Sequence, residues 1–193
     1  LFPEVKDKTF DAIFADANQR KKAMTLVLEA QGYLKQNNLT KPAGRNALEF
    51  YQRALALDPD NRDAKQGIAF IVTKLVDSAE QKYQANQLAS ALEAAQTALQ
   101  LAPGNAQARQ LVSKTSKVVD RQANITRLLD RANKKVQQGQ LFTPAKQGAF
   151  HDYKTVLSLD PNNDVAQQGV ERVVDALSAR MWQLVGSEQF TQA

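Results

Sequence analysis

Apolar residues recur along the chain at intervals of three and four positions, which is the spacing of one face of an α-helix. One such set consists of Ala47, Tyr51, Ala54, Leu55 and Leu57. No stretch alternates apolar and polar residues in the manner of a β-strand. The pattern predicts helices at about residues 10–16, 19–36, 43–57, 61–85, 87–101, 105–138, 144–159 and 163–186. We therefore expect an all-α fold in which short turns make neighbouring helices pack as antiparallel hairpins.

Turn signals separate these helices, and one signal occurs twice, as LALDPDN at 55–61 and LSLDPNN at 157–163. The residue before a proline is disfavoured in the helical region, so the first helix is expected to end at Asp58. Asn61 is a good N-cap for the next helix, and Asp63 would lie in its first turn, where the helix dipole favours an acid. The motif therefore predicts the end of one helix, a tight turn and the start of the next.

The two motifs belong to a longer internal repeat. An offset of 102 positions, the difference between 141 and 39, aligns 39–91 with 141–193 without a gap, and 18 of the 53 residue pairs are identical. In the second copy, Thr143 and Pro144 are expected to supply the cap and the first-turn proline of the helix at 144–159. The second copy stops in mid-pattern, so we expect a truncated array.

Composition limits the class of protein. The chain has 193 residues, of which 43% are hydrophobic and 23% charged, as in an ordinary soluble domain or a run of small repeating units. It has no cysteine, so disulfides and thiolate metal sites are excluded. No apolar run approaches the roughly 20 residues that span a bilayer. Because position 1 is Leu and no signal peptide is present, we expect a piece of a larger protein, with any membrane tether outside it.

Candidate catalytic chemistry is sparse. His151 is the only histidine, and without a second histidine or a cysteine it has no natural partners for general-base or metal chemistry. Asp58 and Asp60 lie in a predicted turn, where acids cap helices. Gly67 and Gly169 lie inside predicted helices, where a missing side chain allows close helix approach, and they form no phosphate-binding loop. We expect no enzymatic activity, no cofactor and no metal, and we expect His151 to be a surface residue.

The net charge of +5 comes from one segment. Residues 105–139 hold eight basic and two acidic residues, a net charge of +6, so the remainder of the chain carries −1. The basic face of the helix at 105–138 consists of Lys114, Lys117, Arg121, Arg131 and Lys135. Its neighbouring apolar side consists of Leu111, Val118, Ile125, Leu129 and Val136. This basic face is either an ordinary solvated surface or a contact for an acidic protein or anionic lipid. No aromatic residues interleave with it, so nucleic acid is not expected.

The spacing of small and aromatic residues resembles the tetratricopeptide repeat (TPR). Ala79, Ala91, Ala98 and Pro103 fit that spacing directly. Ala30, Tyr33, Ala47, Tyr51, Ala54 and Pro59 fit it with five extra residues in the turn NNLTKPAG, and Ala132, Ala149, Tyr153 and Pro161 fit with a similar insertion. The resemblance implies antiparallel hairpins stacked as a right-handed superhelix, an α-α solenoid. The chain departs from a regular array because its helices at 61–85 and 105–138 are long enough to be shared between consecutive hairpins.

This resemblance suggests a division of the chain and a binding surface. Residues 1–18 would be an N-terminal capping helix or a linker, 19–103 a first TPR-like module, and 104–193 a second, truncated one. The concave face would consist of Gln31, Lys35, Glu80, Tyr83, Gln84, Asn133, Gln137 and Trp182. Trp182 aligns with Glu80 of the first copy, and it is either a binding anchor or a plug for the end of the array.

We therefore predict a non-catalytic scaffold that binds a protein or peptide partner. Modules with a Leu-Thr-x-Pro turn and long shared helices are similar to those of envelope-associated bacterial proteins, which favours a periplasmic or inner-membrane-anchored location over the cytoplasm. The alternative is an anion-binding module that uses the basic helix at 105–138 to contact membrane, glycan or nucleic acid. The partner and the oligomeric state cannot be read from the sequence.

Overall fold

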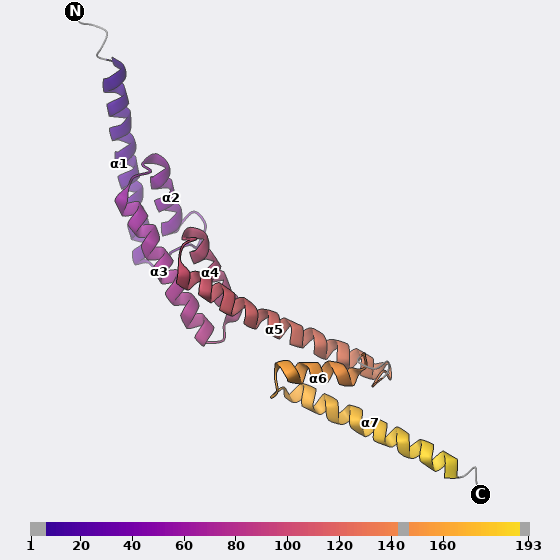
Figure 1. The fold of residues 1–193 in the computed structure, drawn as a ribbon. Coiled ribbons are helices and arrows are strands. Elements are labelled where there is room, and N and C mark those ends of the chain that lie inside the picture. The colour runs from indigo at the N-terminus through magenta and orange to yellow at the C-terminus, as the bar shows by residue number, and fades with distance from the viewer. Residues whose placement is uncertain (1–6, 143–146, 190–193) are drawn as a thin grey trace, which may run out of the picture. The chain divides into compact units, whose positions relative to one another are not determined.

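The computed structural model describes residues 7–142 and 147–189. Over those residues the chain forms seven α-helices and no β-strand, which confirms the all-α prediction (Figure 1). The helices are α1 (Asp7–Lys35), α2 (Ala47–Leu57), α3 (Arg62–Gln84), α4 (Leu88–Leu101), α5 (Ala106–Gln137), α6 (Ala149–Leu159) and α7 (Asp164–Gln189). They belong to two compact units, Leu1–Thr115 and Ser116–Ala193.

The first helix corrects the sequence-based boundaries. Instead of separate helices at 10–16 and 19–36, α1 is one continuous helix, so residues 7–18 belong to the same helix as residues 19–35. Asp16 and Arg20 form an ion pair of 2.9 Å, one turn apart, across the expected break. No proline or glycine interrupts the chain there, and a salt bridge at this spacing supports helix continuity.

The first unit is built from two helical hairpins, α1–α2 and α3–α4, and α2 also packs on α3. Its core is made of alanines and branched residues, with Tyr51 and Ile71 among the largest fully buried side chains. Tyr51 packs on α3 at Gly67, where an added Cβ would overlap the tyrosine ring. In the second unit Tyr153 of α6 meets Gly169 of α7 in the same way. The expectation that these glycines permit close helix approach is confirmed.

The two LxLDPxN motifs form matching turns. Asn61 caps α3 by accepting a hydrogen bond from the backbone N–H of Ala64 at 3.0 Å, and its side-chain amide donates to Asp58 Oδ2 at 3.1 Å. Asn163 makes the same pair of bonds, to Ala166 and Asp160, both at 3.1 Å. The capping role predicted for Asn61 is confirmed.

The helix α2 begins at Ala47 rather than at residue 43, because Asn46 closes its N-terminus. The buried Asn46 side chain accepts from Glu49 N–H at 3.0 Å and donates to Glu49 Oε1 at 2.8 Å. Glu49 Oε2 also accepts from the backbone N–H of Gly44 at 2.7 Å, so Asn46 and Glu49 together close this end of the helix. The preceding loop is tied at its base, where Ala47 N–H donates to Asn38 O at 2.9 Å.

The second copy keeps this loop base but not the cap. Ala149 N–H donates to Gln140 O at 2.9 Å, the bond equivalent to the one in the first copy. Gly148 takes the cap position, without a side-chain bond, and α6 begins at Ala149. The prediction of a helix start at residue 144 is therefore wrong. Thr143 and Pro144 themselves lie outside the described residues.

The division between the units falls within α5, whereas the sequence placed it before this helix, at residues 103/104. The physical reason is that the first turns of α5 bury Ala108 and Leu111 in the core of the first unit. Leu128 and Ala132, further along α5, are buried in the core of the second unit. One long helix thus contributes to two separate cores.

Candidate functional site

A polar cavity lies between α3 and α5 in the first unit. It has a volume of about 300 Å³. Its lining consists of Val76, Asp77 and Glu80 from α3 and Gln107, Gln110, Leu111 and Lys114 from α5. On each helix these positions are spaced by one, three or four residues, so they form one face over consecutive turns. Val76 and Leu111 are nearly buried and supply the apolar part of the wall.

Two of the charged groups of the cavity, Glu80 and Lys114, contact neighbouring side chains. Glu80 Oε1 accepts a hydrogen bond from Gln84 Nε2 at 3.3 Å, one turn along α3. The Lys114 ammonium lies 3.9 Å from the ring centroid of Tyr83, a cation–π contact across the two helices. The wall therefore offers two carboxylates, one ammonium and two amides around a small apolar patch. Such a surface suits hydrogen bonding to a polar or cationic group.

The structure brings together some of the predicted binding residues. Glu80 lines this cavity together with Lys114 from the predicted basic face. Gln84 donates to Glu80, and Tyr83 contacts Lys114, so both lie next to the lining. The two predicted residues on α1, Gln31 and Lys35, are exposed, and neither lines the cavity.

The sequence reasoning missed Asp77, Gln107 and Gln110. Their signal was available in the spacing of three between Asp77 and Glu80, and between Gln107 and Gln110, on facing helices. What the sequence did not supply is the pairing of α3 with the start of α5.

The remaining predicted residues belong to the second unit. Asn133 is not a free surface group, because its Oδ1 accepts a hydrogen bond from the Tyr153 hydroxyl at 2.6 Å. Gln137 is exposed. Trp182 is 75% exposed and lines a hollow of about 210 Å³ with Ser178, Met181 and Val185.

Two residues of the predicted basic face hold a buried acid. Asp152 of α6 is fully buried, and its Oδ2 accepts hydrogen bonds from Arg131 Nε at 2.9 Å and from Lys135 Nζ at 2.7 Å. Burial alone would raise the pKa of the Asp152 carboxyl, but the hydrogen bonds and charges of Arg131 and Lys135 outweigh it, so the pKa is lowered. The hydrogen bond to Asp152 likewise raises the pKa of Arg131. This cluster joins α5 to α6.

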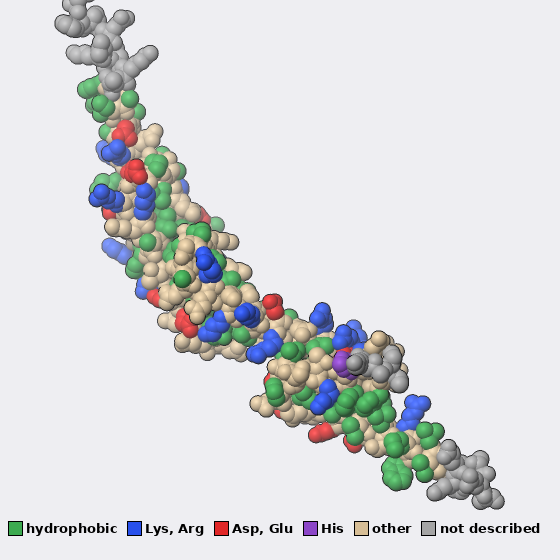
Figure 2. Space-filling view, in the orientation of Figure 1, with side chains coloured by type: hydrophobic (Ala, Val, Ile, Leu, Met, Phe, Trp, Pro, Cys, Tyr) green, Lys and Arg blue, Asp and Glu red, His purple; other side chains and the backbone are tan. Residues whose placement is uncertain are grey.

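The basic face therefore does not act as one free surface. Lys114 lies at the α3–α5 cavity, and Arg131 and Lys135 belong to the Asp152 cluster. Lys117 and Arg121 are exposed. Lysine and arginine side chains are visible along the surface of α5 in Figure 2.

A shallow hollow in the second unit does collect basic groups. It has a volume of about 580 Å³ and is lined by Ala123, Thr126, Arg127, Asp130, Arg131 and Lys134 of α5. Of the apolar side predicted for this helix, Leu111 is buried, and Ile125, Leu129 and Val136 pack against the second core. Val118 is half-buried and belongs to neither core.

Groups that could support metal chemistry are not clustered in the described part of the chain. There, no set of three or more His, Cys, Asp or Glu side chains is arranged to hold a metal ion. His151 is exposed, as expected for a surface residue. Among the same residues, no helix combines the length and the apolar character needed to cross a membrane.

Comparison with protein families, with curated proteins and with solved structures finds no match for this chain.

Proposed function

We propose that this chain is a non-catalytic protein–protein interaction scaffold, built as a TPR-like array of stacked helical hairpins. The observation that carries the proposal is the cavity between α3 and α5, which is lined by Asp77, Glu80 and Lys114 on the two helices. In a TPR-like right-handed superhelix, side chains at such positions line the concave face. The resemblance of the loop before α2 to modules of bacterial envelope proteins extends the proposal to a periplasmic or inner-membrane-anchored protein.

The proposed mechanism is display by a rigid surface. The cavity side chains project from helices whose other faces are buried, with Val72 of α3 at 5% and Ala108 of α5 at 0% exposure. A peptide that binds such a surface does not have to order it, which lowers the entropic cost of association. Two carboxylates against one ammonium favour a peptide with a lysine, arginine or hydrogen-bonding side chain at the cavity.

The test is a selection of random phage-displayed peptides on the intact chain, followed by calorimetry of the enriched peptides. We expect Asp77→Ala and Glu80→Ala to weaken binding by about tenfold or more, which corresponds to about 1.4 kcal/mol. Asp120→Ala, an exposed acid elsewhere on α5, serves as the matched control. Enriched peptides that bind the two cavity variants as well as the parent chain would show that the cavity is not the binding site.

A second candidate is the anion-binding module, and the hollow lined by Arg127, Arg131 and Lys134 favours it. Binding to phosphatidylglycerol vesicles, heparin or single-stranded DNA would then fall steeply between 50 and 200 mM salt. Charge reversal should use Lys117, Arg121 and Arg127, which are exposed, and should spare Arg131, which holds Asp152. If the triple reversal to Glu leaves binding to these probes unchanged, this candidate is excluded.

A further inference from the structure

From Val174 onward, α7 carries an exposed apolar stripe. The α7 stripe consists of Val174, Met181, Trp182 and Val185, which are 45%, 66%, 75% and 47% exposed. Positions 174, 181, 182 and 185 lie on one helical face, at intervals of seven, eight and eleven residues. Figure 2 shows hydrophobic side chains gathered along this helix. Single exposed apolar residues are ordinary on protein surfaces, whereas a contiguous exposed apolar stripe is typical of an interaction site.

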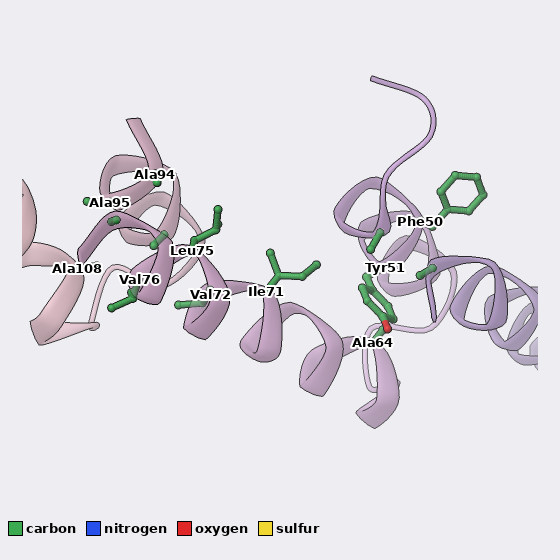
Figure 3. Packing of buried hydrophobic residues seen from close by; sticks show 14 of the residues in the cluster. Phe50, Tyr51, Ala64, Ile71, Val72, Leu75, Val76, Ala94, Ala95 and Ala108 are labelled. Atoms are coloured by element: carbon green, nitrogen blue, oxygen red, sulfur yellow. The ribbon is translucent and has the colours of Figure 1, made fainter. Parts of the chain in front are cut away.

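The internal repeat identifies what covers the same face in the first unit. With the offset of 102, Val72 of α3 corresponds to Val174, and Ala79 corresponds to Met181. Val72 is 5% exposed and Ala79 is fully buried. The helix α4 packs along α3, and Figure 3 shows Ala94 of α4 near Leu75 of α3. Glu80 and Tyr83, the equivalents of Trp182 and Val185, lie on the side of α3 that faces α5.

The covering helix has a defined chemistry. The face of α4 that is buried consists of Leu88, Ala91, Ala94, Ala95 and Ala98. Alanines at intervals of three and four let two helix backbones approach closely. Its other face carries polar groups such as Glu93 and Gln96, which are exposed. The helix that packs along α3 in the first unit is thus amphipathic, with an alanine-rich buried side.

The α7 stripe is also continuous with a packed interface. Val173, next to Val174, is 1% exposed in the second core, and Val170 and Leu177 pack against that core. The apolar surface therefore runs from the α6–α7 contact directly into the stripe. The second copy replaces Ala79 by Met181 and Glu80 by Trp182, so the stripe offers a partner more apolar area than α3 does.

We propose that the α7 stripe is a docking surface for an amphipathic helix that presents alanine and leucine at the spacing found in α4. This inference rests on the proposed function as an interaction scaffold. It adds a second binding surface, separate from the α3–α5 cavity, and states the kind of partner that this surface would bind. Met181 and Trp182 would pack between the small side chains of the docked helix, whose polar face would stay in solvent.

The experiment uses the α4 segment itself as the probe. A synthetic peptide of residues 88–105, LASALEAAQTALQLAPGN, is titrated into the intact chain, and the fluorescence of Trp182, the only tryptophan, reports binding. We expect a saturable blue shift with one peptide per chain and modest affinity, because a peptide of this length must first become helical. Met181→Lys should weaken binding by about tenfold or more, with circular dichroism confirming an unchanged helix content.

Two controls separate docking from other events. Leu28→Lys, a change at a 58% exposed residue of α1, should leave the titration unchanged. A peptide with Glu at the positions of Ala94 and Ala95 should not bind. If the peptide instead displaced α4 from α3, Met181→Lys would have no effect on its affinity, and the proposal would be overturned.

Absence of a fluorescence change at millimolar peptide also overturns the proposal. Sedimentation of the chain alone tests a second copy as the occupant, and self-association that Met181→Lys abolishes would assign the stripe to dimer formation instead. The readout is independent of the cavity variants at Asp77 and Glu80. Failure of the peptide selection at that cavity and failure of this titration are therefore distinguishable.

Discussion

The ring of Tyr51 on α2 lies directly against Gly67 on α3, so closely that the glycine has no room for a Cβ. Tyr51 is 2% exposed, and burial raises the pKa of its hydroxyl, with a smaller contribution from the charge of Asp63. This contact fixes how near the two helices come, because a tyrosine ring occupies the space that any other residue at position 67 would fill.

Gly67→Ala should destabilise the first unit. In an open helix this change stabilises by up to about 1 kcal/mol, through helix propensity and the unfolded chain. At Gly67 the added carbon collides with a buried ring, and such overpacking costs about 1–3 kcal/mol. Urea unfolding measures the difference. Gly32→Ala is the matched control, because nothing lies near a Cβ at that helical position, and it should be neutral or stabilising. Equal effects of the two substitutions would contradict the packing argument.

The Asp152 cluster should make stability depend on pH. The pKa of Asp152 is lowered in the folded chain, so its stabilising contribution is present above the ordinary Asp pKa of about 3.9 and is lost as the pH falls through the lower folded value. Urea unfolding from pH 7 to pH 3 should show this loss in the parent chain. In Asp152→Asn the stability should be lower at pH 7, by about 1–3 kcal/mol, and should change less on acidification.

The matched control for that experiment is Asp130→Asn, which neutralises an exposed acid of α5. Its pH profile should follow that of the parent chain. A profile for Asp152→Asn as steep as that of the parent would mean that other carboxyl groups cause the acid sensitivity.

Asn61→Ala should destabilise the first unit by about 1 kcal/mol, because the backbone N–H of Ala64 loses its capping acceptor. Asn163→Ala should cost a similar amount, since the second turn has the same bonds. Asn162→Ala, next to that cap and exposed, is expected to have little effect. Thermal unfolding of the three variants measures these losses of stability. If Asn162→Ala lost as much stability as Asn163→Ala, the capping explanation would be ruled out.

Trp182 should fluoresce as a solvent-exposed indole in the isolated chain, because three quarters of its surface is accessible. Acrylamide should quench it efficiently at low protein concentration. A blue-shifted, quencher-protected emission at micromolar protein would show that Trp182 is already covered, and the exposure described above would be wrong.

The two copies of the repeat diverge where local sequence gives little warning. Asp152 aligns with Phe50, and Lys135 with Tyr33. In the first unit the rings of Phe50 and Tyr33 lie 5.0 Å apart between centroids, whereas the second unit places an ion pair of 2.7 Å at the same positions. The same helix–helix contact is therefore stabilised by apolar packing in one copy and by a buried charge cluster in the other.

The sequence by itself determined the helices and most of their ends, because a helix start or stop depends on residues within one or two turns. The Asp-Pro turns and the caps at Asn61 and Asn163 were readable for that reason. Even the cap that Asn46 forms with Glu49 has a local signal, although the predicted start at residue 43 overlooked it.

Only the tertiary structure decided which side chains meet. Arg131 and Asp152 are 21 positions apart and carry no mark of their pairing, so the basic face could not be separated into paired and free charges from the sequence. The cavity formed by Glu80 and Gln110, and the exposure of Met181 where the equivalent Ala79 is buried, likewise depend on which helices pack together. Packing is a property of distant segments in contact, whereas helix formation is a property of neighbours along the chain.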